Sequence, residues 1–127
     1  MELMLNDKQT VYDVVSDCLS RLGVSPVKLG YTYLIEAVVY VLDDEETLCG
    51  VTKNLYPHLA RMFSTTPQAV ERAIRTAISN ACALDAEELH AFNGKKEKKL
   101  HFTNKEFIYK TVNAVKRQFE TVNIDKY

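Results

Sequence analysis

Residues 56–83 read YPHLARMFSTTPQAVERAIRTAISNACA, and their pattern predicts a short helix, a tight turn and a longer helix. Ala60 stands where the two helices are expected to cross, because only a small side chain lets two backbones approach at a steep angle. Val70 is the apolar residue expected to dock the second helix on the first. The turn Ser64–Thr66 supplies a hydroxyl N-cap, and Pro67 loses no hydrogen bond at the first helical position. The stretch therefore predicts a helix-turn-helix.

The predicted helix 67–82 has two faces. Apolar residues recur along it at spacings of three and four, which predicts one buried stripe. Arginine can pair with guanine, glutamate can accept from cytosine and glutamine can pair with adenine, so the opposite face suits a DNA major groove. An amphipathic helix with two exposed arginines is also common in helical proteins of other kinds, so this segment alone leaves that alternative open. The residues expected to face the groove are Thr66, Gln68, Ala69, Glu71, Arg72, Arg75 and Thr76.

Length and composition predict one domain over residues 1–127, in the cytoplasm. The sequence has no run of about eighteen apolar residues and no secretory signal pattern at its start, so no membrane contact is expected. Cys18, Cys49 and Cys82 are isolated on apolar stripes and are expected to be reduced core residues. The three histidines lack metal-ligand spacing and there is no phosphate-binding glycine loop, so we expect no metal, cofactor or catalysis.

Charge is unevenly distributed along the chain. Residues 1–50 hold three basic and nine acidic side chains, a net charge of −6, whereas residues 51–127 hold thirteen basic and eight acidic ones, a net charge of +5. Because a DNA duplex attracts positive potential, the split would orient the basic half toward DNA. Lys53 and Arg61 are expected to contact phosphates, together with the lysine run at residues 95–99.

The whole chain predicts an all-α fold of six helices. Gly23 is expected to end the first helix, Pro57 to stop or kink the third, and Thr103 with Glu106 to form a capping box that opens the last. Residues 84–94 are expected to be irregular. The predicted helices are about 8–22, 31–43, 47–55, 57–63, 67–82 and 104–120.

Four segments together resemble a known family. They are Gly30-Tyr31-x-Tyr33-Leu34-x-Glu36-Ala37, Thr52-Lys53-x-Leu55-Tyr56-Pro57-x-x-Ala60, Thr65-Thr66-x-x-x-Val70-Glu71-Arg72-Ala73-Ile74-Arg75-x-Ala77-Ile78 and Thr103-Asn104-x-Glu106-Phe107-Ile108. They resemble the C-terminal DNA-binding effector domain of the sporulation initiation protein A family of endospore-forming Firmicutes, over roughly residues 10–120. The resemblance implies a six-helix domain that binds double-stranded DNA at boxes resembling TGTCGAA and activates or represses transcription.

The resemblance also implies partners. Family members often bind as a tandem pair on duplicated boxes, which implies a homodimer on DNA. The segment after their DNA-reading helix helps to contact the sigma subunit of RNA polymerase, and this role falls on Phe92 here.

The sequence departs from the family at three points. The family places Arg at the position of Ala69 and His at that of Thr76, so base preference is expected to differ. Members carry an N-terminal receiver domain with a phosphorylatable Asp, for which 127 residues leave no room, so the chain is either a standalone paralogue or an excised domain.

The competing interpretation is a helical interaction module that keeps the fold but binds sigma factor or a full-length homologue instead of DNA.

Overall fold

The computed structural model describes residues 8–44, 50–93 and 100–126, and these residues form helices without any strand. The predicted all-α class is therefore confirmed. In chain order the elements are α2 (Lys8–Arg21), α3 (Leu29–Asp43), the π-helix η2 (Val51–Leu55), α4 (Tyr56–Met62), α5 (Pro67–Leu84), α6 (Glu87–Asn93) and α7 (Asn104–Lys126).

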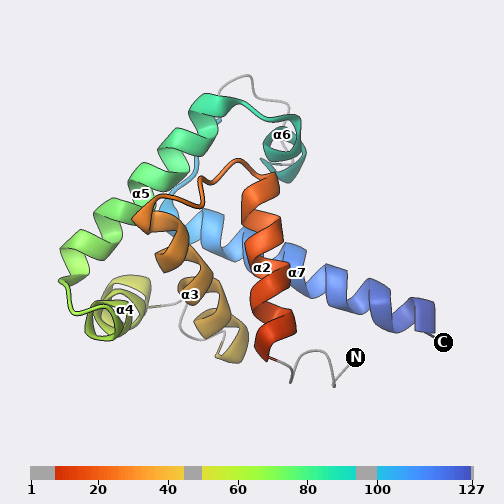
Figure 1. The fold of residues 1–127 in the computed structure, drawn as a ribbon, viewed down its shortest axis with the longest axis horizontal. Helices are drawn as coiled ribbons and strands as arrows, with labels where there is room; N and C mark the ends of the chain where they lie inside the picture. The colour runs from red at the N-terminus through yellow and green to blue at the C-terminus, as the bar shows by residue number, and fades with distance from the viewer. Residues whose placement is uncertain (1–7, 45–49, 94–99, 127) are drawn as a thin grey trace.

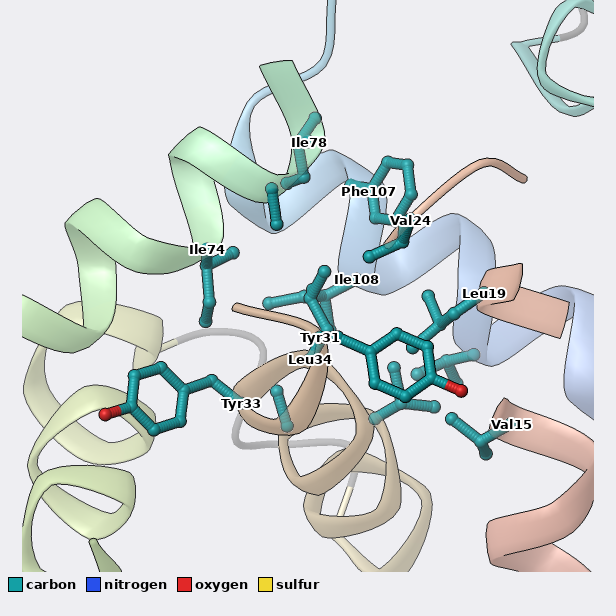
Figure 2. Close-up of a cluster of buried hydrophobic side chains, with 14 of the residues drawn as sticks. Val15, Leu19, Val24, Tyr31, Tyr33, Leu34, Ile74, Ile78, Phe107 and Ile108 are labelled. Carbon is teal, nitrogen blue, oxygen red and sulfur yellow. The ribbon is translucent and has the colours of Figure 1, made fainter. Parts of the chain in front are cut away.

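Helix α3 lies at the centre of the molecule, in contact with α2, α4, α5 and α7 (Figure 1). Its apolar side chains point in several directions, because a helix that is apolar almost all round has to be covered on several sides. Figure 2 shows Tyr31 pointing toward α2 and Tyr33 pointing toward α4. The ring of Tyr33 lies 5.0 Å from that of Phe63. The central core is completed by Ile74 and Ile78 from α5 and by Phe107 and Ile108 from α7 (Figure 2).

The start of α3 packs directly against α5. A Cβ atom added at Gly30 would lie 2.3 Å from the carbonyl oxygen of Ala73 and 2.6 Å from the Cβ of Ala77. No side chain fits at that distance from a backbone oxygen, so glycine is what allows the two helices to touch. This contact fixes α5 on the central helix.

Three predicted helix ends are confirmed. Gly23 has a φ of 96°, and the amide of Val24 donates to the Leu19 carbonyl at 3.0 Å, which closes α2 as expected for a glycine C-cap. The Thr66 hydroxyl accepts from the Ala69 amide at 3.1 Å at the start of α5. Thr103 and Glu106 form the predicted capping box at α7, with reciprocal bonds of 3.0 and 3.1 Å.

The connection between α4 and α5 is short and well anchored. Leu59, Ala60 and Val70 are buried, as predicted for two helices that cross closely. The Thr65 amide donates to the Ala60 carbonyl at 2.9 Å, and Ser64 adopts a left-handed conformation with a φ of 54°. The two helices therefore meet at an ordered turn of four residues, 63–66.

Several predicted boundaries were wrong by one to six residues. The second helix begins at Leu29 rather than at residue 31, because its N-cap is Lys28, a residue type that gives no capping pattern in the sequence. The fourth covers Tyr56–Met62 rather than 57–63, α5 continues to Leu84 rather than residue 82, and α7 continues to Lys126 rather than residue 120.

One prediction of local structure was confirmed in its position, and one was wrong. The third helix was expected to reach residue 55 and to stop or kink before Pro57. Helix η2 does end at Leu55, but it is π-helical, and α4 follows directly with Pro57 in its first turn. A π-helical segment is wider than an α-helix, which accommodates a proline that has no N–H to donate. The segment 84–94, expected to be irregular, contains α6, whose seven residues are too few to show a periodic apolar stripe. Residues 47–49 of the predicted third helix lie outside the described residues.

Cys18 and Cys82 are free thiols, as predicted, and Cys49 lies outside the described residues. Burial raises the pKa of both described thiols, which keeps them in the unreactive protonated form.

Candidate nucleic-acid interface

Helix α5 separates its two faces as its sequence predicts. Val70, Ile74 and Ile78 are buried against the rest of the protein. The opposite face is in solvent over the length of the helix, apart from Glu71, which is half-buried. The exposed residues on this face are Gln68, Ala69, Arg72, Arg75, Thr76 and Ser79. One face of α5 is thus an anchor and the other is a polar surface.

The two arginines on this surface differ in their surroundings. Arg75 donates from Nη1 to both carboxylate oxygens of Glu71, at 2.5 and 2.9 Å. Arg72 makes no ion pair with any described residue. Asp85, at the end of α5, pairs with His90 at 2.5 Å and not with an arginine. The exposed face of α5 therefore carries Arg75 in an ion pair and Arg72 without an ion pair to the described residues.

A polar contact joins α5 to two other helices. The side-chain amide of Asn104 in α7 donates to the main-chain carbonyl of Glu71 at 3.1 Å and to the hydroxyl of Tyr56 in α4 at 3.0 Å. Burial raises the pKa of Tyr56, whose hydroxyl oxygen accepts this bond. The backbone that carries Glu71 and Arg75 is therefore fixed from both α4 and α7.

The surface of α5 is bordered by grooves on both sides. The larger one, of about 670 Å³, runs between α5 and the start of α7 and is lined by Lys53, Glu71, Arg75, His101 and Lys105 among others. A smaller hollow of about 290 Å³ lies at the start of α5, between Tyr56 and Gln68. Lys53 and Arg75, both predicted DNA-contacting residues, therefore line the same groove.

The opposite groove, of about 350 Å³, lies between α5 and the start of α3. Ala69 and Thr76 line it, with Arg72 between them along the helix and Lys28 on the far side. Leu29 lines it too and is 60% exposed. The small side chains of Ala69 and Thr76 therefore leave a hollow at the surface of α5.

Arg61 and Phe92 lie away from these grooves. Arg61 is exposed on α4 and lines none of the three. Phe92 is half-buried on α6, with its ring centroid 5.7 Å from that of Phe102 and 5.4 Å from that of Phe107. The ring therefore serves as a packing residue on at least one side. The lysine run at residues 95–99 lies outside the described residues.

Sequence reasoning missed three residues beside α5. His101, Asn104 and Lys105 line the larger groove, although they lie 17 to 21 residues after the end of α5 in the chain. The capping box placed Asn104 and Lys105 in the first turn of the last helix. Nothing in the sequence indicated that this turn would pack next to α5, because that is a tertiary contact.

Among the described residues, no group of three or more His, Cys, Asp or Glu side chains gathers as a metal site would need. His58 stacks on Tyr40, with ring centroids 4.0 Å apart, and His90 pairs with Asp85. Among the described helices, none has the length and apolar character needed to cross a membrane.

An all-α fold with two exposed arginines on one helix face between two grooves is an arrangement that helical DNA-binding domains use. The family model described as sporulation initiation factor Spo0A C terminal matches residues 15–115 of the chain. The protein belongs to this family, which is one of DNA-binding transcription regulators in sporulation. The match includes α3, α4, α5 and α6 in full.

Proposed function

We propose that this protein is a sequence-specific transcription regulator that reads the DNA major groove with α5, its helix-turn-helix being α4 and α5. The observation that carries the proposal is the exposure of Gln68, Arg72 and Arg75 on a helix whose other face is fully buried. An α-helix has a diameter of about 10–12 Å with its side chains, which matches a major groove about 12 Å wide.

The roles of the site residues follow from their chemistry. Arg72 and Arg75 present guanidinium groups that bind O6 and N7 of guanine, Gln68 suits adenine, and Glu71 either accepts from cytosine or orients Arg75. Thr66, at the N-cap, and Thr76 stand at the edges of the same surface. Lys53 and Arg61 contact phosphates, with Lys53 in the groove beside Arg75 and Arg61 on α4.

The assembly on DNA is also part of the proposal. We expect one domain over residues 1–127, without catalytic activity, that acts in the cytoplasm and binds duplicated sites as a homodimer. A contact with the sigma subunit would use Phe92, through the part of its ring that Phe102 and Phe107 leave uncovered. The exposed start of α6 beside it carries Glu87 and Glu88, which suit a basic partner surface.

One observation favours the second candidate, a module that binds sigma factor or a full-length homologue instead of DNA. The hollow beside α5 lacks the Arg and His that the family places at Ala69 and Thr76. Beside it, Leu29 is 60% exposed and Val27 is 87% exposed, and apolar side chains suit a protein partner better than a phosphate backbone.

A gel-shift titration separates the two candidates. The protein is titrated against a duplex carrying a TGTCGAA-like box and against a random duplex of equal length at fixed salt. Preference for the box supports sequence-specific reading by α5. Equal binding to both duplexes contradicts it, and absence of binding to either favours the protein-interaction module.

A further inference from the structure

The larger groove beside α5 gathers basic side chains from separate parts of the chain. Lys53 comes from η2, Arg75 from α5, His101 from the segment before α7, and Lys105 from α7 itself. The acidic side chain that lines the groove is Glu71, and both its oxygens accept from Arg75. The charge of Glu71 is therefore already paired, and the groove keeps the unpaired charge of Lys53 and Lys105 among its described residues.

Lys105 occupies a position that helix electrostatics disfavour. It is the second residue of α7, and the N-terminal end of a helix carries a partial positive charge that repels a cation. Its side chain is exposed, and no described carboxylate pairs with it. A cation at this position, with no pairing carboxylate among the described residues, does not stabilise the helix, so we look for its role in binding.

Geometry places DNA phosphates in this groove when α5 reads bases. A helix that fills the major groove has the backbones of both DNA strands along its sides, one on each flank. The flank toward α7 offers Lys53, His101 and Lys105. The flank toward α3 offers Lys28 and Arg72, and its other lining residues are uncharged.

We propose that the groove between α5 and the start of α7 seats the phosphate backbone of one DNA strand, with His101 and Lys105 as phosphate-contacting residues. This inference rests on the proposed function, because it requires α5 in the major groove. It adds that the protein holds the two strands unequally. Lys53 and Lys105 are available to the strand beside α7, whereas Lys28 is the charged residue available to the strand beside α3, because the proposed function assigns Arg72 to a base.

The first test measures affinity and salt dependence together. Lys105→Gln is compared with Lys8→Gln, a matched control at the start of α2, far from α5 (Figure 1). We expect Lys105→Gln to weaken binding of every duplex roughly twofold to fivefold, and to make the slope of log affinity against log salt about 0.9 less negative. Lys8→Gln should change neither. Lys105→Arg, which keeps the charge, should restore the wild-type slope, and His101→Ala should weaken binding of every duplex without changing sequence preference.

Thermal stability distinguishes phosphate contact from a structural role. Because Lys105 opposes the dipole of α7, its replacement by Gln should leave the melting temperature unchanged or raise it while affinity falls. A lower melting temperature in parallel with lower affinity would show that Lys105 supports the fold, and would overturn the proposal.

The second test uses duplexes in which single phosphates are replaced by neutral methylphosphonates, one strand at a time. We expect the larger losses of affinity on one strand, and we expect Lys105→Gln to be insensitive to replacement of the phosphate it contacts. If the wild-type protein binds no duplex in a salt-dependent way, the proposed function itself fails. If it binds DNA but Lys105→Gln behaves as Lys8→Gln does, or both strands are equally sensitive, the function stands and this inference is overturned.

Discussion

At the scale of single residues, the two arginines of α5 differ in the ion pairs that they form within the protein. Arg75 forms an ion pair with Glu71 one turn earlier, whereas Arg72 pairs with no carboxylate among the described residues. The side chain of Arg75 is 63% exposed, and an exposed pair at this spacing contributes only about 0.3–0.5 kcal/mol to stability. The pair therefore matters more for the direction of the guanidinium group than for the fold.

Replacing each arginine by alanine should affect DNA binding much more than it affects the stability of the fold. Arg72→Ala should cost roughly 1–3 kcal/mol of binding to the preferred site and relax discrimination at one base pair, with no loss of thermal stability, because alanine is the better helix former. Arg75→Ala should have the same effect on binding and a stability cost below about 0.5 kcal/mol. Binding to a panel of single-base variants and thermal melting check both. A variant that loses stability but keeps its specificity would mean that the arginine is structural.

Ala69 is exposed in the first turn of α5, where a longer side chain can extend along the groove beside Arg72. Ala69→Arg should tighten binding to a TGTCGAA-like box by about 1–3 kcal/mol if it forms a bidentate contact with guanine. The measurement compares that box with a duplex changed at one central base pair. Equal gains on both duplexes would identify the new side chain as a phosphate contact, and no gain in a folded variant would favour the protein-interaction module.

At the scale of elements, the contact between α3 and α5 determines where the proposed reading helix stands. Gly30→Ala should destabilise the protein by about 1–3 kcal/mol, although alanine favours a helix, because the added Cβ would meet the Ala73 backbone oxygen. Chemical denaturation measures the change. Thr32→Ala, exposed on the same helix, is the matched control and should be neutral or slightly stabilising. A Gly30→Ala variant as stable as the control would show that α3 and α5 can separate without cost.

The contact between α2 and α3 is expected to contribute less to the free energy of unfolding at high pH. The Tyr12 hydroxyl donates to Glu36 at 2.5 Å, and burial, then Glu36, raises the pKa of Tyr12 to about 12. Since an unfolded tyrosine ionises near pH 10, the stability from this group is complete below pH 10 and is lost as the pH rises from 10 through 12. Tyr12→Phe should flatten the fall in unfolding free energy over that range. Tyr109→Phe, on an exposed side chain, is the control, and equal curves for the two variants would contradict the prediction.

The helices also show which structural features could be predicted from the sequence and which could not. Capping at Thr66 and at Thr103 was predictable, because each cap depends on side chains within three residues of one another. The two faces of α5 were predictable because eighteen residues give a long periodic pattern. Helix α6 was missed because seven residues give none. The groove that joins His101 and Lys105 to α5 was missed because only the packing of α7 against the rest of the fold creates it.

At the scale of the whole molecule, the uneven charge of the chain coincides with its architecture. The half with a net charge of +5 contains α5 and the larger groove beside it, whereas the half with a net charge of −6 supplies α2 and α3. A DNA duplex would attract one half and repel the other, so the field of the protein favours approach with α5 toward the duplex.

This field makes a prediction about salt. If Lys53, Arg61 and some of the lysines at residues 95–99 neutralise phosphates, log affinity should fall linearly with log salt, with a slope near −0.9 for each phosphate. Neutralising the lysine run should weaken binding to box and random duplexes about equally, because phosphate contacts hold the protein without reading bases. Filter binding or fluorescence anisotropy across a salt series measures both effects. Since ionic strength screens a long-range field but leaves apolar contact intact, an affinity for DNA that does not depend on salt would be incompatible with a basic surface around α5.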